Sequence, residues 1–315
     1  MTAEPSQLSP HRADRVDLPG RHGPIAALRA PEPSGDTVPV ALLLPGYTGS
    51  KEDFAPLFDP IADAGIQPVA IDLPGQYESG GPADEQAYFP AELGLVVAEL
   101  VGKLAADGRP VLLLGHSFGG LVARAAILAQ APVVGLTLMG SGPSELPLGP
   151  RRRALDIGMM TLREYGVAAT RRLMDEMDSV NPDAPRLPPE VRPPEVRELL
   201  RQRFLRSSQE GLLGMAEGLC TEPDLVGALG RCLRRSGTSC LVVCGENDDA
   251  WPVSTQRDMA DRLAADFAVV TGSAHSPNTE NPQGLLATLL PTWRSWLDGA
   301  GGAGFVPSGE DEMSG

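Results

Sequence analysis

The sequence predicts an α/β protein in which helices cover both faces of a mostly parallel sheet. Short apolar segments of strand length alternate with longer segments of helical pattern along most of the 315-residue chain. The strand segments are apolar almost throughout, which is typical of parallel strands buried on both faces. The alternation stops over residues 144–235, where the pattern predicts a mostly helical insertion.

Six segments have the length and composition of buried strands: residues 38–44, 67–72, 109–114, 133–139, 239–244 and 266–271. Helical patterns lie between and after them, at residues 51–64, 91–106, 118–130, 254–264 and 283–297. The connections follow the usual doubly wound pattern, in which a strand, a helix and the next strand form a parallel unit.

The predicted domain organisation follows from the position of the insertion. It comprises an N-terminal tail (1–15), a core (16–143 and 236–298), a helical insertion (144–235) and a C-terminal tail (299–315). Both tails are expected to be disordered, because the first is polar and the second is Gly-rich and acidic. The insertion contains a Pro-rich linker at residues 181–194, and its apolar side chains either line a pocket or pack against the core.

The composition disfavours several classes of partner. Lys and Arg number 26 against 41 Asp and Glu, and the formal net charge of −15 disfavours nucleic acid and anionic membrane surfaces. No segment approaches about 18 uninterrupted apolar residues, and residues 1–17 lack the pattern of a signal peptide. We therefore expect a cytoplasmic protein without a membrane span that acts on a small molecule, its oligomeric state being left open.

The cysteines predict neither a metal site nor a cofactor. Cys220, Cys232, Cys240 and Cys244 form no CxxC pair, and His275 is the only histidine that follows them. Cys240 and Cys244 lie in an apolar strand segment, where small buried thiols are common. We expect the cysteines to be structural.

The segment Gly-His-Ser-Phe-Gly-Gly at residues 115–120 predicts a nucleophile elbow. It follows an apolar strand and begins an Ala-rich helix, which is the strand–turn–helix setting that a GxSxG pattern requires. The flanking glycines remove the Cβ atoms that would block so sharp a turn. Ser117 is therefore the candidate nucleophile.

The candidate base follows from the scarcity of histidine. A serine hydroxyl is a poor nucleophile at neutral pH and needs a neutral imidazole within hydrogen-bonding distance. His11 and His22 lie in the early polar region, and His116 is expected to point to the other side of the elbow. His275 remains, in a loop after the last predicted strand, where open α/β sheets place their chemistry.

The candidate acid is expected at the end of a strand, between the serine and the histidine in sequence. Asp248 lies at the apex of the loop that follows the strand at 239–244, and it is preferred to its neighbour Asp249, which has the position of a turn or cap residue. Glu145, after the strand at 133–139, is a weaker alternative.

An acyl-transfer site also needs two donors for the tetrahedral oxyanion. The backbone N–H of Phe118, at the start of the helix after the elbow, is one candidate. The backbone N–H of Tyr47 is the second, because glycines on both sides of the segment 47–48 allow it to turn inward. The alternative for residues 45–50 is a plain strand-to-helix turn.

Together these residues resemble the α/β-hydrolase family, whose members have an oxyanion loop, a GxSxG elbow, an acid and a histidine in that order. The resemblance covers residues 38–297. It implies the α/β-hydrolase fold, a triad acid at Asp248, a catalytic His275 and a helical cap that shapes the acyl pocket. It also implies a structural role for Asp72. Many members have His-Gly at the start of the oxyanion loop, where this chain has Pro-Gly at residues 45–46.

The predicted function is that of a serine hydrolase that cleaves an ester or thioester of a small or medium acyl substrate through an acyl-serine intermediate. C–C bond hydrolysis, amide hydrolysis and acyl transfer use the same residues, and a non-catalytic ligand-binding member of the fold is a further alternative. Ser117 argues against dehalogenases and epoxide hydrolases, which use an aspartate elbow. The run Arg151, Arg152 and Arg153 is either a solvated face or a site for an anionic substrate.

Overall fold

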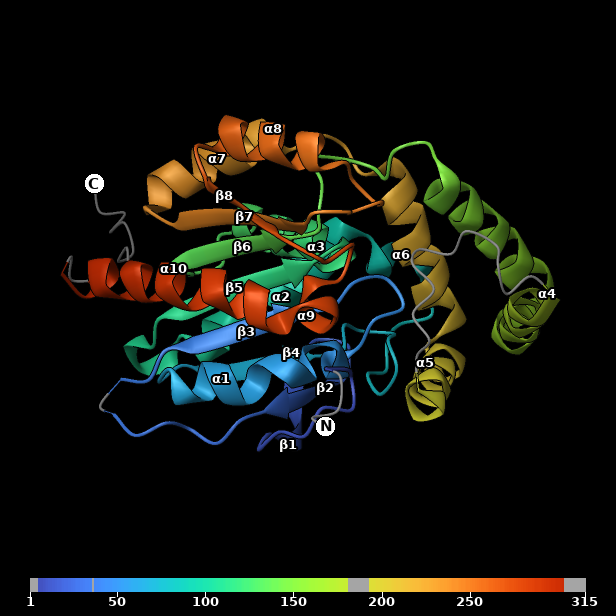
Figure 1. Cartoon of the computed structure of the whole chain (residues 1–315), viewed down its shortest axis with the longest axis horizontal. Coiled ribbons are helices and arrows are strands. Elements are labelled where there is room, and N and C mark those ends of the chain that lie inside the picture. The colour runs from blue at the N-terminus through green and yellow to red at the C-terminus, as the bar shows by residue number, and fades with distance from the viewer. Residues whose placement is uncertain (1–4, 36, 181–192, 303–315) are drawn as a thin grey trace, which may run out of the picture.

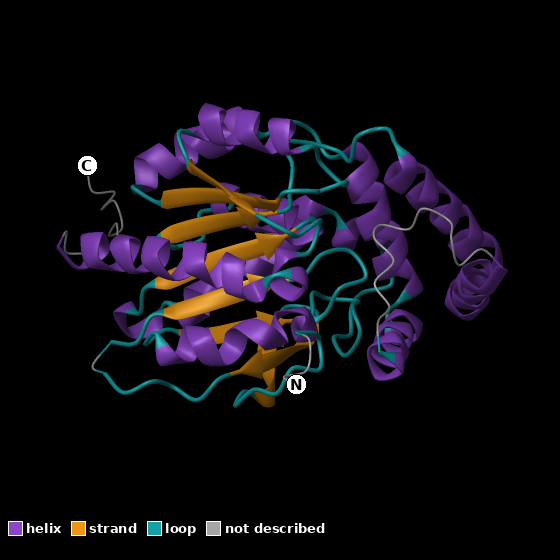
Figure 2. Ribbon diagram, in the orientation of Figure 1, coloured by secondary structure: helices purple, strands orange, loops and turns teal. Residues whose placement is uncertain are grey.

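The chain folds around one twisted sheet (Figures 1 and 2). The computed structural model describes residues 5–35, 37–180 and 193–302. Within these residues eight strands pair in the order β1-β2-β4-β3-β5-β6-β7-β8. The strands are β1 (Asp14–Gly20), β2 (Gly23–Arg29), β3 (Val40–Leu44), β4 (Gln67–Ile71), β5 (Val111–His116), β6 (Gly135–Met139), β7 (Ser239–Gly245) and β8 (Asp266–Val270).

The six predicted strands correspond to β3 to β8, and all five pairings among them are parallel. Successive side chains of these strands point to opposite faces of the sheet. Leu42 and Leu113 belong to the apolar cluster on one face, and Leu43 and Leu112 to the cluster on the other. Burial on both faces is the reason that these segments are continuous apolar runs.

Helices cover both faces, as predicted. The core helices are η1 (Lys51–Leu57), α1 (Phe58–Asp63), η2 (Glu85–Tyr88), α2 (Pro90–Leu104), η3 (Ala106–Gly108), α3 (Phe118–Leu128), α8 (Val253–Leu263), α9 (Pro277–Glu280) and α10 (Pro282–Gly302). Helices α2, α3 and α8 contribute to one apolar cluster, whereas η1, α1 and α10 contribute to the other. The last four residues of α10, 299–302, belong to the segment predicted as a tail, and residues 303–315 lie outside the described residues.

The antiparallel hairpin of β1 and β2 was not predicted. β2 pairs antiparallel with β4, so the hairpin forms one edge of the sheet. The structure also differs from the predicted tail over residues 5–15, where Gln7 donates to Asp53 and Arg12 pairs with Asp59. The edge strand β1 is mostly exposed, and its weak apolar alternation is easily missed.

Four helices lie between β6 and β7 in sequence, among the residues that the structure describes there. They are α4 (Pro150–Val180), α5 (Pro194–Arg206), α6 (Gln209–Thr221) and α7 (Val226–Ser236). Figure 2 shows α4, α5 and α6 beyond the ends to which the parallel strands point, and α7 packs on α3 and α8. The predicted Pro-rich linker at 181–194 lies outside the described residues except for its last two positions, Pro193 and Pro194.

A buried arginine joins α3 to the segment before α4 and to the segment after α6. Arg124 of α3 donates to the carbonyl of Pro143, before α4, and to the carboxylate of Glu222, after α6. The two connections also bond directly, because Glu145 N–H donates to the carbonyl of Glu222 over 2.8 Å. The start of α4 and the end of α6 are therefore held together beside α3.

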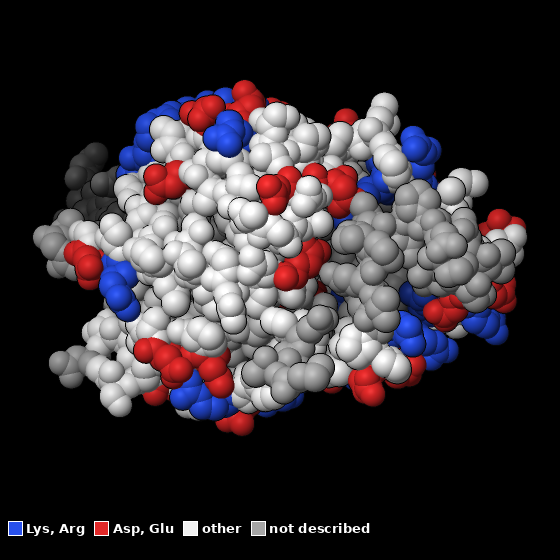
Figure 3. Space-filling view, viewed as in Figure 1, with Lys and Arg blue, Asp and Glu red and all other residues white. Residues whose placement is uncertain are grey.

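The surface carries charges of both signs. Figure 3 shows acidic and basic side chains in small groups over the described part of one face, without a continuous basic area. This agrees with the excess of acidic residues in the sequence. Among the described residues, no helix combines the length and the apolar character needed to cross a bilayer.

Candidate active site

Ser117 stands at a strained turn between β5 and α3. Its φ and ψ are 54° and −120°, in a region that non-glycine residues rarely adopt and that marks a local cost held by the surrounding structure. A Cβ atom at Gly115 would lie only 2.2 Å from the carbonyl oxygen of Gly119. The elbow therefore requires glycine at position 115, and the turn directs the serine away from the sheet.

The structure brings together Ser117, His275 and Asp248. The Oγ atom of Ser117 lies 2.9 Å from Nε2 of His275, and Nδ1 of the same ring lies 3.0 Å from Oδ1 of Asp248. The three residues come from the ends of β5, β8 and β7, and each is about 8% exposed. This arrangement can move a proton from the hydroxyl to the imidazole, while the carboxylate orients the ring.

The carboxylate of Asp248 is held by three hydrogen bonds. Its Oδ1 accepts from Ala250 N–H as well as from His275, and its Oδ2 accepts from Nε2 of Gln256. Burial alone would raise the pKa of Asp248, but the hydrogen bonds and the charge of His275 outweigh burial and lower it. Asp248 is thus ionised at neutral pH. Sequence reasoning missed Gln256, since a glutamine in the first turn of a helix has no distinguishing pattern.

The rival acids point elsewhere. Asp249 faces the inserted helices, where its two carboxylate oxygens accept from Nε and Nη2 of Arg151 over 2.8 and 2.7 Å. Glu145 pairs with Arg152 over 3.0 Å. Two members of the arginine run are therefore engaged by acidic side chains of the chain itself.

His116 lies against the histidine loop. Its Nε2 is 2.8 Å from the carbonyl of His275, which can only accept, so Nε2 carries the proton. Among the described residues Nδ1 has no partner. Burial, followed by the charge of His275, lowers the pKa of His116 to about 4, and the ring is neutral at physiological pH. His116 therefore holds the backbone of the loop that carries His275.

The lowered pKa of His116 predicts a loss of stability in mild acid. Because the unfolded chain binds this proton near pH 6.5 and the folded chain only near pH 4, stability is complete above pH 6.5 and falls as the pH decreases towards 4. At about 1.4 kcal/mol per pKa unit, the loss reaches roughly 3 kcal/mol. His116→Gln, which keeps a donor for the His275 carbonyl but cannot titrate, should remove this part of the pH dependence in urea unfolding. An identical pH dependence in both proteins would contradict the assignment.

The candidate oxyanion donors lie beside the serine. A Cβ atom at Gly46 would be 3.1 Å from Cβ of Ser117, so the loop after β3 passes directly over the elbow. Phe118 N–H is at the first position of α3, where helix amides have no partner within the helix. No hydrogen bond from Tyr47 N–H or Phe118 N–H to another group exists within the described residues. Both amides are therefore free to donate to a ligand.

A cavity of about 980 Å³ opens over these residues. The inserted helices and their connections contribute apolar side chains to its wall, among them Leu146, Leu155, Met174, Phe204 and Leu219. They also contribute Arg151, Arg171 and Arg203. Arg203 pairs with Asp53 of the core over 2.6 Å. The apolar residues of the insertion thus line a pocket and also pack within the insertion, where Phe204 joins a cluster with Leu162 and Leu213.

No group of three or more His, Cys, Asp or Glu side chains suited to a metal ion occurs in the described part of the chain. The four cysteines are free thiols, and Cys220, Cys240 and Cys244 are buried. Burial raises the pKa of Cys240 and of Cys244 to about 12, so these thiols are protonated at neutral pH.

The fold agrees with a comparison to known families. Residues 41–288 match the model of the alpha/beta hydrolase family. The chain belongs to this family, and the fold and the resemblance predicted from sequence are confirmed.

Solved structures of similar fold include several hydrolases. A carboxylesterase of the thaumarchaeon Nitrososphaera gargenis has a TM-score of 0.70 and 17% identity, over 91% of this chain and 100% of the other. A thermophilic esterase from Thermogutta terrifontis has a TM-score of 0.65 and 22% identity, over 91% and 99%. The enol-lactonase from Burkholderia xenovorans LB400 has a TM-score of 0.64 and 16% identity, over 87% and 97%. No curated protein matches the chain significantly.

Proposed function

We propose that the protein is a serine hydrolase that cleaves an ester or thioester of a small or medium acyl substrate. The observation that carries the proposal is the continuous relay from Ser117 Oγ through His275 to Asp248, with distances of 2.9 and 3.0 Å. A protein that only binds a ligand has no physical need for a nucleophile, a base and an orienting carboxylate within hydrogen-bonding distance of one another.

In the first half of the proposed reaction, Nε2 of His275 takes the proton of Ser117 as Oγ attacks the substrate carbonyl. The amides of Tyr47 and Phe118 stabilise the tetrahedral oxyanion. The intermediate collapses when the imidazolium returns its proton to the departing alcohol or thiol, which leaves an acyl-serine. Asp248 stabilises the imidazolium throughout and stays ionised.

In the second half, His275 deprotonates a water molecule that attacks the acyl-serine. A second tetrahedral intermediate forms at the same donors, and its collapse releases the carboxylic acid and restores the Ser117 hydroxyl. We propose that α4, α5 and α6 form a cap whose apolar side chains receive the acyl chain, since all three helices line the same cavity as Ser117.

A fluorophosphonate probe tests the nucleophile, because it phosphonylates a serine only where a base activates it. Mass spectrometry of the labelled, digested protein should find one adduct, on the peptide that contains Ser117. Turnover of p-nitrophenyl esters and acyl thioesters of increasing chain length then defines the acyl pocket and the leaving group. An unlabelled protein that binds apolar ligands without hydrolysis would instead identify a non-catalytic member of the fold.

A further inference from the structure

We infer that Gln76 is a positioning residue for the oxyanion hole. Its side-chain amide donates to the carbonyl of Gly46, and this carbonyl belongs to the same peptide unit as the N–H of Tyr47. The inference rests on the proposed function, in which that N–H stabilises the oxyanion. Gln76 contacts no reacting atom in this arrangement and acts through the backbone of the loop.

Both ends of the Gln76 amide are engaged, which fixes its orientation. Nε2 donates to the Gly46 carbonyl over 2.8 Å, and Oε1 accepts from Leu73 N–H over 3.1 Å. Rotating the amide by half a turn would set oxygen against oxygen at Gly46 and donor against donor at Leu73. The side chain is 1% exposed, so water cannot replace either partner easily.

The planarity of the peptide bond transmits this contact to the N–H group. In a trans peptide the C=O and the N–H point in opposite directions from a rigid plane. A donor that holds the Gly46 oxygen therefore also holds the direction of Tyr47 N–H. The residue before this peptide bond is glycine, whose backbone rotates at little steric cost, and the plane needs an external anchor. Gly49 N–H supplies a second donor to the same oxygen over 3.0 Å.

The hydrogen bond also strengthens the donor electrostatically. A carbonyl that accepts a hydrogen bond draws electron density through the peptide and makes its N–H a better donor, and the effect is larger where water is excluded. Two donors to the Gly46 oxygen thus prepare Tyr47 N–H for a developing negative charge.

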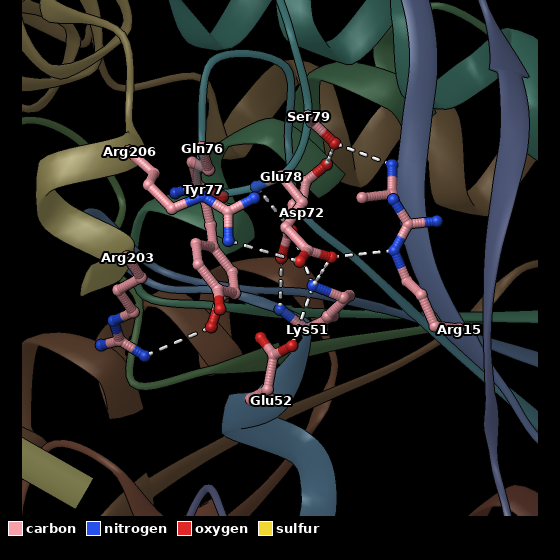
Figure 4. A network of polar contacts seen from close by, with 12 residues as sticks. Arg15, Lys51, Glu52, Asp72, Gln76, Tyr77, Glu78, Ser79, Arg203 and Arg206 are labelled. Carbon is pink, nitrogen blue, oxygen red and sulfur yellow. Dashed lines mark hydrogen bonds and ion pairs between the residues drawn. The ribbon is translucent and has the colours of Figure 1, made fainter. Parts of the chain in front are cut away.

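The turn that carries Gln76 is braced from the core side (Figure 4). Asp72, which precedes the turn and is fully buried, accepts from the backbone N–H of Lys51 over 2.8 Å and from its Nζ over 3.0 Å. Its carboxylate also accepts from Glu78 N–H, and its carbonyl accepts from Ser79 Oγ. Both ends of the turn are therefore tied to one buried carboxylate residue.

The inserted helices brace the turn from the other side. The ring of Tyr77 lies between Lys51 and Arg206 of α5, each cation 4.7 Å from the ring centroid (Figure 4). Tyr77 N–H donates to Ser207 Oγ, and Ser208 N–H donates to the carbonyl of Gly75. Gln76 thus lies on a turn that is held between the core and the junction of α5 and α6. A side chain that orients another group must itself be held in place in this way.

The test compares two buried glutamines. Gln76→Met preserves the length of the side chain but removes both hydrogen bonds. It should lower kcat for p-nitrophenyl esters by about 10- to 100-fold, while KM changes less than about threefold. The expected loss is smaller than the roughly 10²–10³-fold fall in kcat that follows removal of a direct oxyanion donor, because Gln76 acts through the loop backbone. The control is Gln67→Met at the start of β4. Gln67 is also buried and donates to a backbone carbonyl, that of Ala30, over 2.9 Å. The control should lose stability without losing kcat.

An aryl boronic acid supplies a readout that a purely structural role would not move. Its tetrahedral adduct on Ser117 places an oxygen where the oxyanion forms, so its affinity should fall in parallel with kcat in Gln76→Met and stay unchanged in Gln67→Met. Should Gln76→Met fail to fold, Gln76→Asn, one methylene short of the Gly46 oxygen, is expected to show the same split. A folded Gln76 variant whose kcat and boronate affinity equal those of the control overturns the inference.

The two proposals fail in different ways. An inactive wild-type protein that the fluorophosphonate does not label refutes the proposed function. In that event a crystal structure of Gln76→Glu decides the inference alone, because a carboxylate oxygen at this position repels the Gly46 carbonyl. A rotated peptide between residues 46 and 47 supports the positioning role, and an unchanged peptide overturns it.

Discussion

Replacing Ser117 with alanine is expected to reduce kcat/KM for p-nitrophenyl esters by a factor on the order of 10⁴–10⁶ and to abolish fluorophosphonate labelling. The reason is that Ser117 Oγ, at 2.9 Å, is the one hydroxyl in contact with His275 Nε2 among the described residues. Steady-state kinetics with active-site titration of the wild-type protein measures the change. The residual rate should come from the amides of Tyr47 and Phe118 alone.

Ser141 provides the matched control for this substitution. It is also buried beside the elbow, at 1% exposure, but its Oγ has no partner among the described residues and it does not line the cavity. Ser141→Ala should keep full activity and labelling. If Ser117→Ala retained the turnover of this control, Ser117 could not be the nucleophile.

The second large effect is expected at the acid. Asp248→Asn should lower kcat/KM by about 10⁴-fold, because an amide donates where His275 Nδ1–H must donate and thus favours the wrong tautomer of the imidazole. Asp249→Asn, one position further along, should change kcat/KM less than about threefold. Its carboxylate pairs with Arg151, and because the two side chains are 25% and 29% exposed, solvent screens the pair.

These two variants test Asp248 against Asp249, the alternative acid that the sequence leaves open. Circular dichroism and thermal unfolding of both proteins would establish that the Asp248 variant is folded. Equal losses of activity at the two positions, or a larger loss at Asp249, would reject Asp248 as the orienting carboxylate and remove the relay on which the proposed function depends.

The core strands could be predicted because burial determines their residue composition. β3 and β5 are buried on both faces and are therefore continuous apolar runs. β1 has one buried residue, Leu18, in seven, and such an edge strand carries little periodic signal. Its place in the sheet depends on pairing with β2, and β2 in turn pairs with β4, a contact between distant parts of the chain.

The candidate site could be predicted where local backbone geometry dictates residue type. The elbow needs glycine at positions 115 and 119, where a Cβ atom would lie 2.2 Å and 2.5 Å from a backbone oxygen, and the scarcity of histidine leaves few choices for the base. The choice between Asp248 and Asp249 needed the structure, because Asp249 is turned towards Arg151, which lies 98 residues away in sequence. Gln76 could not be found from the sequence, because its role depends on a carbonyl 30 residues earlier.

Arg124 ties the inserted helices to the helix that begins beside Ser117. Its helix begins immediately after Ser117, and its guanidinium binds the chain at both Pro143 and Glu222. A lid that swung outward as a rigid flap would have to break this buried ion pair, which lies at 1% and 9% exposure and would leave an uncompensated charge. Any widening of the cavity that keeps this ion pair must therefore leave the start of α4 and the end of α6 in place and move the parts of the inserted helices that lie farther from α3.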